Sequence, residues 1–310
     1  MVLFSSLALS GCGSGVRRDT YTTTVAPLAT DDLAGPCVYE TPIPVQAVPQ
    51  TAVLVIFERG DSDDLFLDVS MRKMAASLHM TTVFAHECDA ASFNDLQPDA
   101  SKGPGRALFT ALNQFAAMTQ HPELATSKVY LFGFSSAGLL SITLTQEYPD
   151  RVLGALPFAS GSAYLNLFDL GVTPEEARVP MLIMGNAEDQ LSGTERSYAF
   201  FGKGRALGAP WGFAIQNGTS HCCSLSTRNL IIPWIEAIAA GKGTAATGGG
   251  VTSYFICTPD GAPDGLGYED LSIREASITT PLVNGEDSGW LPNAATADAW
   301  LTWVTNPQTN

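Results

Sequence analysis

Basic residues are scarce in this sequence. Its 16 Lys and Arg face 31 Asp and Glu, which gives a formal net charge of −15 at pH 7. A surface of that sign repels phosphate backbones, so we expect no nucleic-acid partner. Charged residues make up only 15% of the 310, whereas hydrophobic residues reach 45%, which excludes a disordered chain and permits a large core. No run of 18 or more apolar residues occurs, so we expect no ordinary transmembrane helix.

The first 12 residues form an apolar stretch that ends in small residues, which is typical of an export signal. Within it, Leu9-Ser10-Gly11-Cys12 resembles the bacterial lipobox, in which the cysteine receives the lipid. No Lys or Arg precedes the apolar stretch, and the alternative is a chance match of four residues. The resemblance implies a lipid anchor at Cys12. The predicted location is therefore the bacterial cell envelope, outside the cytoplasm, with the protein either lipid-anchored or secreted.

Residues 13–50 are expected to form a tether rather than folded structure. The segment opens with Gly and Ser, continues with a run of Thr, and contains prolines at positions 27, 36, 42, 44 and 49. It offers few periodic apolar positions to pack against a core, so we predict a spacer.

Export also changes the interpretation of the cysteines. Beyond Cys12 the chain holds five: Cys37, Cys88, Cys222, Cys223 and Cys257. In an oxidising compartment this number predicts two disulfides and one free thiol. A bridge between neighbours is strained, so we expect Cys222 and Cys223 to have distant partners, or one of them to stay free. A metal site at His221-Cys222-Cys223 is disfavoured because three consecutive side chains do not easily converge on one ion.

From residue 51 the chain alternates apolar runs with amphipathic segments. The pattern predicts strands at 52–57, 81–85, 129–132, 152–158, 181–184 and 212–215, and helices at 65–79, 106–119, 137–148 and 225–240. Strands that alternate with helices indicate an α/β fold with a mostly parallel central sheet and helices on both faces, here spanning 51–242. A Gly-rich break follows. Residues 243–310 are then expected to form a short extension, with a strand at 251–257 and a helix at 294–304, packed on the core.

The segment 129–138 carries the strongest functional signal. A strand leads directly into Gly133-Phe134-Ser135-Ser136-Ala137 and then into a helix. This arrangement is similar to the nucleophile elbow of α/β-hydrolases, whose sharp turn demands tiny side chains two residues before and two after the serine. Gly133 and Ala137 satisfy that demand around Ser135. The alternative is an ordinary turn with a serine helix cap.

A serine needs a base to become nucleophilic, and the family resemblance implies the chain order serine, acid, histidine. The four histidines are at positions 79, 86, 121 and 221, so only His221 follows Ser135. The acid is expected after the strand at 181–184. Both Glu188 and Asp189 are candidates there; we choose Asp189, because Asp is the general preference, and keep Glu188 as the alternate.

Acyl transfer also needs backbone N–H donors for the oxyanion. The resemblance implies one donor at Ser136, the residue after the nucleophile, and a second in the loop after the first predicted strand of the core. That loop reads Phe57-Glu58-Arg59-Gly60-Asp61. We expect the second donor to be the amide of Arg59 or Gly60.

Taken together, residues 51–240 resemble α/β-hydrolases of the esterase and dienelactone-hydrolase-like type. The resemblance implies hydrolysis of small-molecule or polymeric carboxylic esters through an acyl-serine, without a cofactor or metal. Two alternatives stay open: a peptidase on the same scaffold, and a catalytically silent surface lipoprotein that binds a ligand. Residues 159–180 are expected to form either a cover over the site or, preferably, a core helix. The sequence leaves the oligomeric state open.

Overall fold

The computed structural model describes residues 18–44, 48–86, 88–162, 164–241, 250–260, 267–282 and 287–306. The main sheet contains β1 (Arg18–Val25), β2 (Cys37–Pro44), β3 (Ala52–Phe57), β4 (Met80–Ala85), β5 (Val129–Phe134), β6 (Val152–Phe158), β7 (Met181–Asn186) and β8 (Trp211–Gln216). Its helices are α1 (Ser62–Leu67), α2 (Val69–Ser77), α3 (Pro104–Thr119), α4 (Ser136–Glu147), α5 (Thr194–Ala206) and α6 (Arg228–Ala239). In these ranges, no helix has the length and apolar content needed to cross a membrane.

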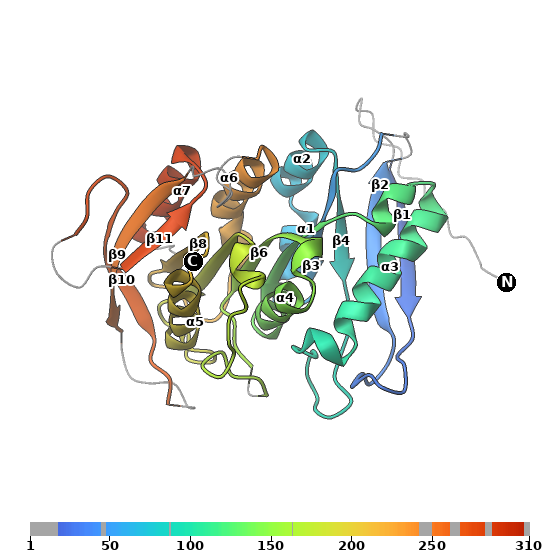
Figure 1. Cartoon of the computed structure of the whole chain (residues 1–310), viewed down its shortest axis with the longest axis horizontal. Coiled ribbons are helices and arrows are strands. Elements are labelled where there is room, and N and C mark those ends of the chain that lie inside the picture. Colours follow the sequence, from blue (N-terminus) through green and yellow to red (C-terminus); the bar gives the residue numbers. More distant parts are fainter. Residues whose placement is uncertain are drawn as a thin grey trace.

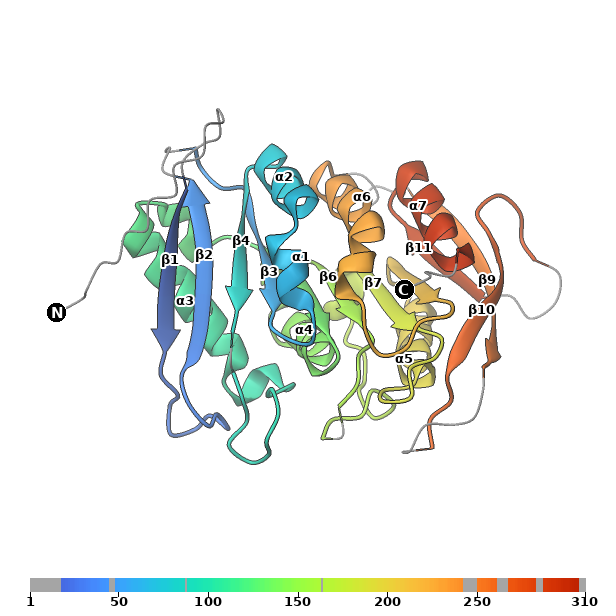
Figure 2. The same ribbon diagram turned by 180° about the vertical axis from the view of Figure 1, so that it is seen from behind.

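The strand order is β1-β2-β4-β3-β5-β6-β7-β8, and β2 runs antiparallel to both of its neighbours. All pairs from β4 to β8 are parallel. Because parallel strands need crossovers, helices cover both faces: α3, α4 and α5 lie on one (Figure 1), and α1, α2 and α6 on the other (Figure 2). The predicted α/β class with a mostly parallel sheet is therefore confirmed.

Alternation along each central strand divides the core into two layers. On β3, Val53 and Val55 join the cluster that includes α3, whereas Leu54 and Ile56 join the cluster that includes α1 and α2. All six residues of β3 are buried. A strand buried on both faces has no polar side to show in its sequence, which explains the continuous apolar run.

The expected tether is wrong for much of its length, because β1 and β2 lie within 13–50 and form the end of the main sheet. Alternate side chains of β2, at Cys37, Tyr39, Thr41 and Ile43, are buried. Cys37 is bonded to Cys88 in the loop after β4, which ties this edge to the core. The prolines hid the period-2 pattern, and proline is tolerated near a sheet edge, where fewer backbone N–H groups need partners.

The expected single helix at 65–79 is two helices, α1 and α2, separated at Asp68. This residue has extended backbone angles, and its carboxylate accepts hydrogen bonds from the amides of Ser70 and Met71 at 2.8 and 2.9 Å. An aspartate that accepts these bonds starts a new helix at its own position. The chain therefore turns at Asp68 and α2 takes a new direction.

The C-terminal part forms a second, antiparallel sheet of β10 (Leu271–Ser277), β9 (Val251–Pro259) and β11 (Asp287–Leu291), followed by α7 (Ala294–Thr305). It packs beside β8 at the end of the main sheet (Figure 1). The buried indole of Trp300 donates a hydrogen bond of 2.7 Å to the carbonyl of Phe213 in β8. This bond satisfies a backbone acceptor on β8, the last strand of the main sheet. A last strand with unpaired backbone groups is open to pairing with another chain.

The segment after β6 is not the core helix preferred from the sequence. Its only helical turn among the described residues is the 3-10 helix Glu176–Arg178. Two reciprocal bonds fix this turn: the amide of Glu176 donates to Thr173 Oγ1 at 3.1 Å, and the amide of Thr173 donates to Glu176 Oε2 at 3.4 Å. They form a capping box, which explains why the Thr-x-x-Glu pattern begins a turn here.

Glu176 is fully buried in this turn, and its Oε1 has no hydrogen-bond partner. Burial raises the pKa of this carboxyl from 4.5 to about 7, against the opposing effect of hydrogen bonds from Gln146 and the Thr173 amide. The unfolded chain therefore loses this proton first, and between pH 4.5 and 7 it binds fewer protons than the folded chain. Stability falls with rising pH across that window and is not affected further above it.

We expect the variant Glu176→Gln to remove this dependence. Relative to wild type, its free energy of unfolding should rise by about 3 kcal/mol between pH 4 and pH 8, because glutamine carries no charge to desolvate. Urea unfolding at both pH values measures the difference. Glu175→Gln, at the exposed neighbouring position, is the matched control and should show no such change. Equal pH dependence in wild type and Glu176→Gln would contradict the assignment.

Candidate active site

The turn from β5 into α4 places Ser135 in a conformation that few side chains adopt. Its backbone angles are φ 57° and ψ −126°, immediately before the first residue of α4. The turn leaves no room beside Gly133, since a Cβ there would lie 2.0 Å from the carbonyl oxygen of Ala137. The Ser135 amide donates to the carbonyl of Phe158 in β6 at 2.9 Å. The tight turn at Gly133 and the hydrogen bond to β6 together hold Ser135 in this conformation. Backbone strain of this kind concentrates at functional sites.

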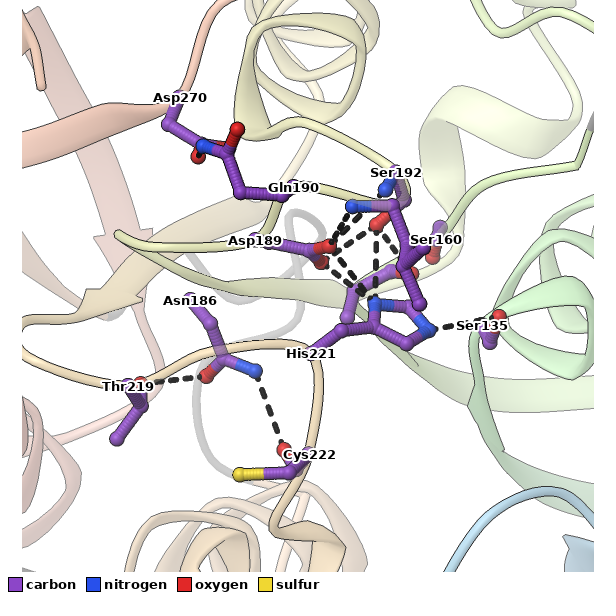
Figure 3. Close-up of polar contacts among 12 residues, drawn as sticks. Ser135, Ser160, Asn186, Asp189, Gln190, Ser192, Thr219, His221, Cys222 and Asp270 are labelled. Carbon is purple, nitrogen blue, oxygen red and sulfur yellow. Dashed lines mark hydrogen bonds and ion pairs between the residues drawn. The ribbon is translucent and has the colours of Figure 1, made fainter. Parts of the chain in front are cut away.

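His221 reaches Ser135 from the loop after β8, across 86 positions of sequence. Its Nε2 lies 3.0 Å from Ser135 Oγ (Figure 3). Asn186 at the end of β7 supports the loop: its side-chain amide donates to the carbonyl of Cys222 at 3.1 Å, and its oxygen accepts from Thr219 Oγ1 at 2.9 Å. The ring of Phe134 also packs on the imidazole, with centroids 4.6 Å apart. These contacts hold the imidazole over the elbow.

The structure distinguishes the two acid candidates after β7. Both carboxylate oxygens of Asp189 lie within 2.9 Å of His221 Nδ1, and Asp189 is fully buried. The side chain of Glu188 is exposed, and its backbone amide donates to the carbonyl of Thr219 at 2.9 Å. Ser135, His221 and Asp189 therefore form one continuous chain of hydrogen bonds, and Glu188 stays outside it.

Asp189 is kept ionised by the donors around it. Burial by itself would raise the pKa of this carboxyl, but His221 and the hydroxyl and amide of Ser192 lower the pKa below its ordinary value. The Ser192 hydroxyl lies 2.5 Å from Asp189 Oδ2, and its amide 2.9 Å from Oδ1. A buried carboxylate with several donors prefers its charged form. Sequence reasoning missed Ser192, whose signal was a serine three residues after an aspartate in a loop.

Of the three candidate oxyanion donors, the amide of Arg59 is engaged in a hydrogen bond within its own loop, whereas Ser136 and Gly60 remain candidates. Ser136 is the first residue of α4, where backbone N–H groups have no partner within the helix. Gly60 has a positive φ of 58° and packs against the ring of Phe134. The amide of Arg59 instead donates to Ser62 Oγ at 2.9 Å, which closes the turn into α1. The expectation for the Arg59 amide is therefore wrong, because its proton is used within its own loop.

Asp95 is a second residue that sequence reasoning missed. Its carboxylate pairs with the guanidinium of Arg59 and lies 3.3 Å from the hydroxyl of Ser136. It comes from the loop after β4, so it connects that loop to the start of α4. No motif in the sequence marked it, because the contact joins residues 41 positions apart.

The structure has the expected two disulfides and one free thiol, but Cys222 and Cys223 do not have the distant partners that the sequence analysis expected. Cys222 and Cys223 are bonded to each other, Cys37 is bonded to Cys88, and Cys257 is free. Cys223 has a left-handed backbone with φ 76° in the loop after His221. The next amide, of Ser224, donates to Asp61 Oδ1 at 3.0 Å. Cys12 and the lipobox-like segment lie outside the described residues.

Comparison with known proteins supports the fold. No family model and no curated protein matches the chain in sequence. Among solved structures, a ferulic acid esterase aligns with a TM-score of 0.52 and 15% identity over 72% of this chain and 100% of its own. An acylaminoacyl peptidase of Pyrococcus horikoshii aligns at 0.51 and 13% over 71% of this chain and 41% of its own. A thermostable esterase aligns at 0.48 and 15% over 64% of this chain; the chain spans 55% of that esterase's length. The protein has the α/β-hydrolase fold.

The neighbouring disulfide gives a test of how the histidine loop is held. Replacing both Cys222 and Cys223 by serine frees Cys223 to leave its left-handed conformation, which costs a non-glycine residue about 1–2 kcal/mol. We expect the amide of Ser224 to exchange its hydrogen about fivefold to thirtyfold faster in the double variant.

Hydrogen exchange followed by mass spectrometry or NMR measures this effect. The amide of Ala187, which donates to the carbonyl of Gln216 at 3.0 Å, is the internal control and should not change. Unaltered exchange at Ser224 would show that the loop is held without the disulfide.

Proposed function

We propose that the protein is a serine hydrolase that cleaves carboxylic esters through an acyl-serine intermediate. The observation that carries this proposal is the hydrogen-bonded chain from Ser135 Oγ through His221 to the buried Asp189. A nucleophile, a base within hydrogen-bond reach and a third group that orients the base are the parts needed for nucleophilic catalysis.

In the first half-reaction Ser135 Oγ attacks the ester carbonyl carbon while His221 Nε2 takes the hydroxyl proton. The carbonyl oxygen becomes an oxyanion, which the amides of Ser136 and Gly60 stabilise. The tetrahedral intermediate then collapses: the bond from carbon to the alcohol oxygen breaks, and the imidazolium returns its proton to the leaving alcohol. The acyl group remains on Ser135.

In the second half-reaction water replaces the alcohol. His221 takes one proton from the water, whose oxygen attacks the acyl carbon, and the bond to Ser135 Oγ breaks as the proton returns to that oxygen. The carboxylic acid leaves. Asp189 holds the imidazole in the tautomer that presents a free Nε2, and its negative charge stabilises the imidazolium formed in both halves. The lowered pKa of Asp189 keeps that charge in place.

The elbow geometry favours hydrolysis over a silent binding protein, since a strained serine beside an oriented imidazole serves no evident purpose in ligand binding alone. A peptidase on this scaffold is the second candidate, and it is favoured by the fold shared with an acylaminoacyl peptidase. We propose an ester substrate and a location outside the cytoplasm, where the two disulfides would persist. A lipid anchor at Cys12 remains part of this proposal.

Covalent labelling with a fluorophosphonate tests the nucleophile. Wild type should be labelled at Ser135 and should hydrolyse 4-nitrophenyl esters without measurable cleavage of the matching anilides. Ser135→Ala should lose the label and about 10⁶-fold in kcat. Ser70→Ala, at an exposed position in α2 outside the site, is the control and should keep both the label and the turnover. A folded wild type that takes no label would favour the binding protein, and measurable anilide cleavage would favour the peptidase.

The acid is tested by two parallel substitutions. Asp189→Asn should lower kcat by about 10⁴-fold, because an amide at this position no longer holds the productive tautomer of His221. Glu188→Gln, at the exposed neighbouring position, should leave kcat unchanged. Steady-state kinetics on a 4-nitrophenyl ester measures both. Full activity in Asp189→Asn would remove Asp189 from the mechanism.

A further inference from the structure

Two aromatic side chains stack on each other between the loops that follow β4 and β6. The rings of Phe93 and Tyr164 are nearly parallel, with centroids 3.8 Å apart and an interplanar angle of 14°. They come from different loops, after β4 and after β6, 71 positions apart in sequence. We shall call them the aromatic pair.

Hydrogen bonds connect both of these loops to the nucleophile elbow. Asp95, two residues after Phe93, lies 3.3 Å from the hydroxyl of Ser136, and its amide donates to the carbonyl of Phe93 at 3.1 Å. On the other side, the amide of Gly161 lies 3.4 Å from the carbonyl oxygen of Ser135, three residues before Tyr164. Three residues span at most roughly 11 Å of chain. The aromatic pair therefore joins the two loops that contact the start of α4.

Hydrogen bonds within each loop hold the backbone beside the aromatic pair. The amide of Tyr164 donates to the hydroxyl of Ser162 at 3.1 Å, and Ser162 is buried. The loop of Phe93 is closed by the amide of Ala90, which donates to the carbonyl of Asp95 at 2.9 Å. These bonds hold the backbone on each side of the stacked rings.

The aromatic pair also leaves ring surface open to solvent. Tyr164 is 58% exposed, and among the large apolar side chains exposed in the described ranges it is the one aromatic residue. A stack of two rings is worth only about 0.5–1.5 kcal/mol. The exposed part of Tyr164 is therefore available for stacking with a ligand.

We infer that the aromatic pair is a specificity-determining wall that selects esters carrying a planar aromatic ring. This inference rests on the proposed serine chemistry. The ester carbonyl must lie at Ser135 Oγ with its oxygen near the Ser136 amide, and Asp95 places the loop of Phe93 at that same residue. We therefore expect the acyl or alcohol group of the ester that lies toward the loop of Phe93 to contact the aromatic pair. A planar ring stacks on it, whereas a saturated ring of equal carbon number does not.

The experiment compares planar and saturated esters on the full chain. Methyl 3-phenylpropanoate and methyl 3-cyclohexylpropanoate probe the acyl side; benzyl acetate and cyclohexylmethyl acetate probe the alcohol side. In at least one couple, wild type should prefer the planar ester in kcat/KM. Tyr164→Ala and Phe93→Ala should each reduce that preference about threefold to tenfold, mainly through KM. Tyr164→Phe should retain it.

Leu207→Ala is the matched control, because Leu207 is 55% exposed at the end of α5 and lies outside the aromatic pair. It should leave the preference and the activity unchanged. A preference that stays the same in both alanine variants overturns the inference, as does an equal loss on the planar and saturated esters. Fluorophosphonate labelling of wild type distinguishes failure of the proposed function from failure of this inference. An unlabelled wild type contradicts the serine chemistry itself. If wild type is labelled and the alanine variants keep its preference, only the role of the aromatic pair is contradicted.

Discussion

The sharp turn between β5 and α4 is the constraint on which the site depends. Ser135 carries a positive φ that a residue with a side chain adopts only at a cost, so its neighbours must hold it there. Gly133 supplies the space, and the Ser135 amide is bonded to β6. The sheet thus directs one hydroxyl away from the core, toward the loops at the carboxyl ends of the strands. Every other part of the site is arranged around that hydroxyl.

The buried carboxylate of Asp189 is stabilised by hydrogen bonds from Ser192 and from the imidazole of His221. Asp189 is buried, yet the hydroxyl and amide of Ser192 and the imidazole of His221 satisfy its oxygens. An unpaired carboxylate at this depth would take up a proton and lose its use as an orienting anion. Glu176 shows the contrast within the same chain: it is buried with fewer donors, and its pKa rises to about 7. Burial and hydrogen bonding together decide which carboxyl stays charged.

Sequence pattern predicted the central part of the fold well, because buried parallel strands are recorded as continuous apolar runs. It failed at the N-terminal strands, where prolines concealed the alternation of Cys37, Tyr39, Thr41 and Ile43. It also failed for the segment after β6, since apolar residues there pack as a loop and only Glu176–Arg178 turns. Local patterns report periodicity, and neither an edge strand with prolines nor a packed loop shows a clear period.

The sequence by itself selected the candidate nucleophile and the candidate base, because Ser135 lies in a local motif and His221 is the only histidine after it. For the acid it offered two neighbours, Asp189 as the choice and Glu188 as the alternate, with only the general preference for Asp to separate them. The tertiary structure places Asp189 buried against His221 and leaves Glu188 in solvent, so the contact supports Asp189 as the candidate acid. It also decided the disulfide pairing, the loss of Arg59 as an amide donor, and the meeting of Phe93 with Tyr164. Each of these depends on contacts between residues far apart in the chain or on the backbone conformation of one loop. A local sequence pattern predicts neither the contacts nor the conformation.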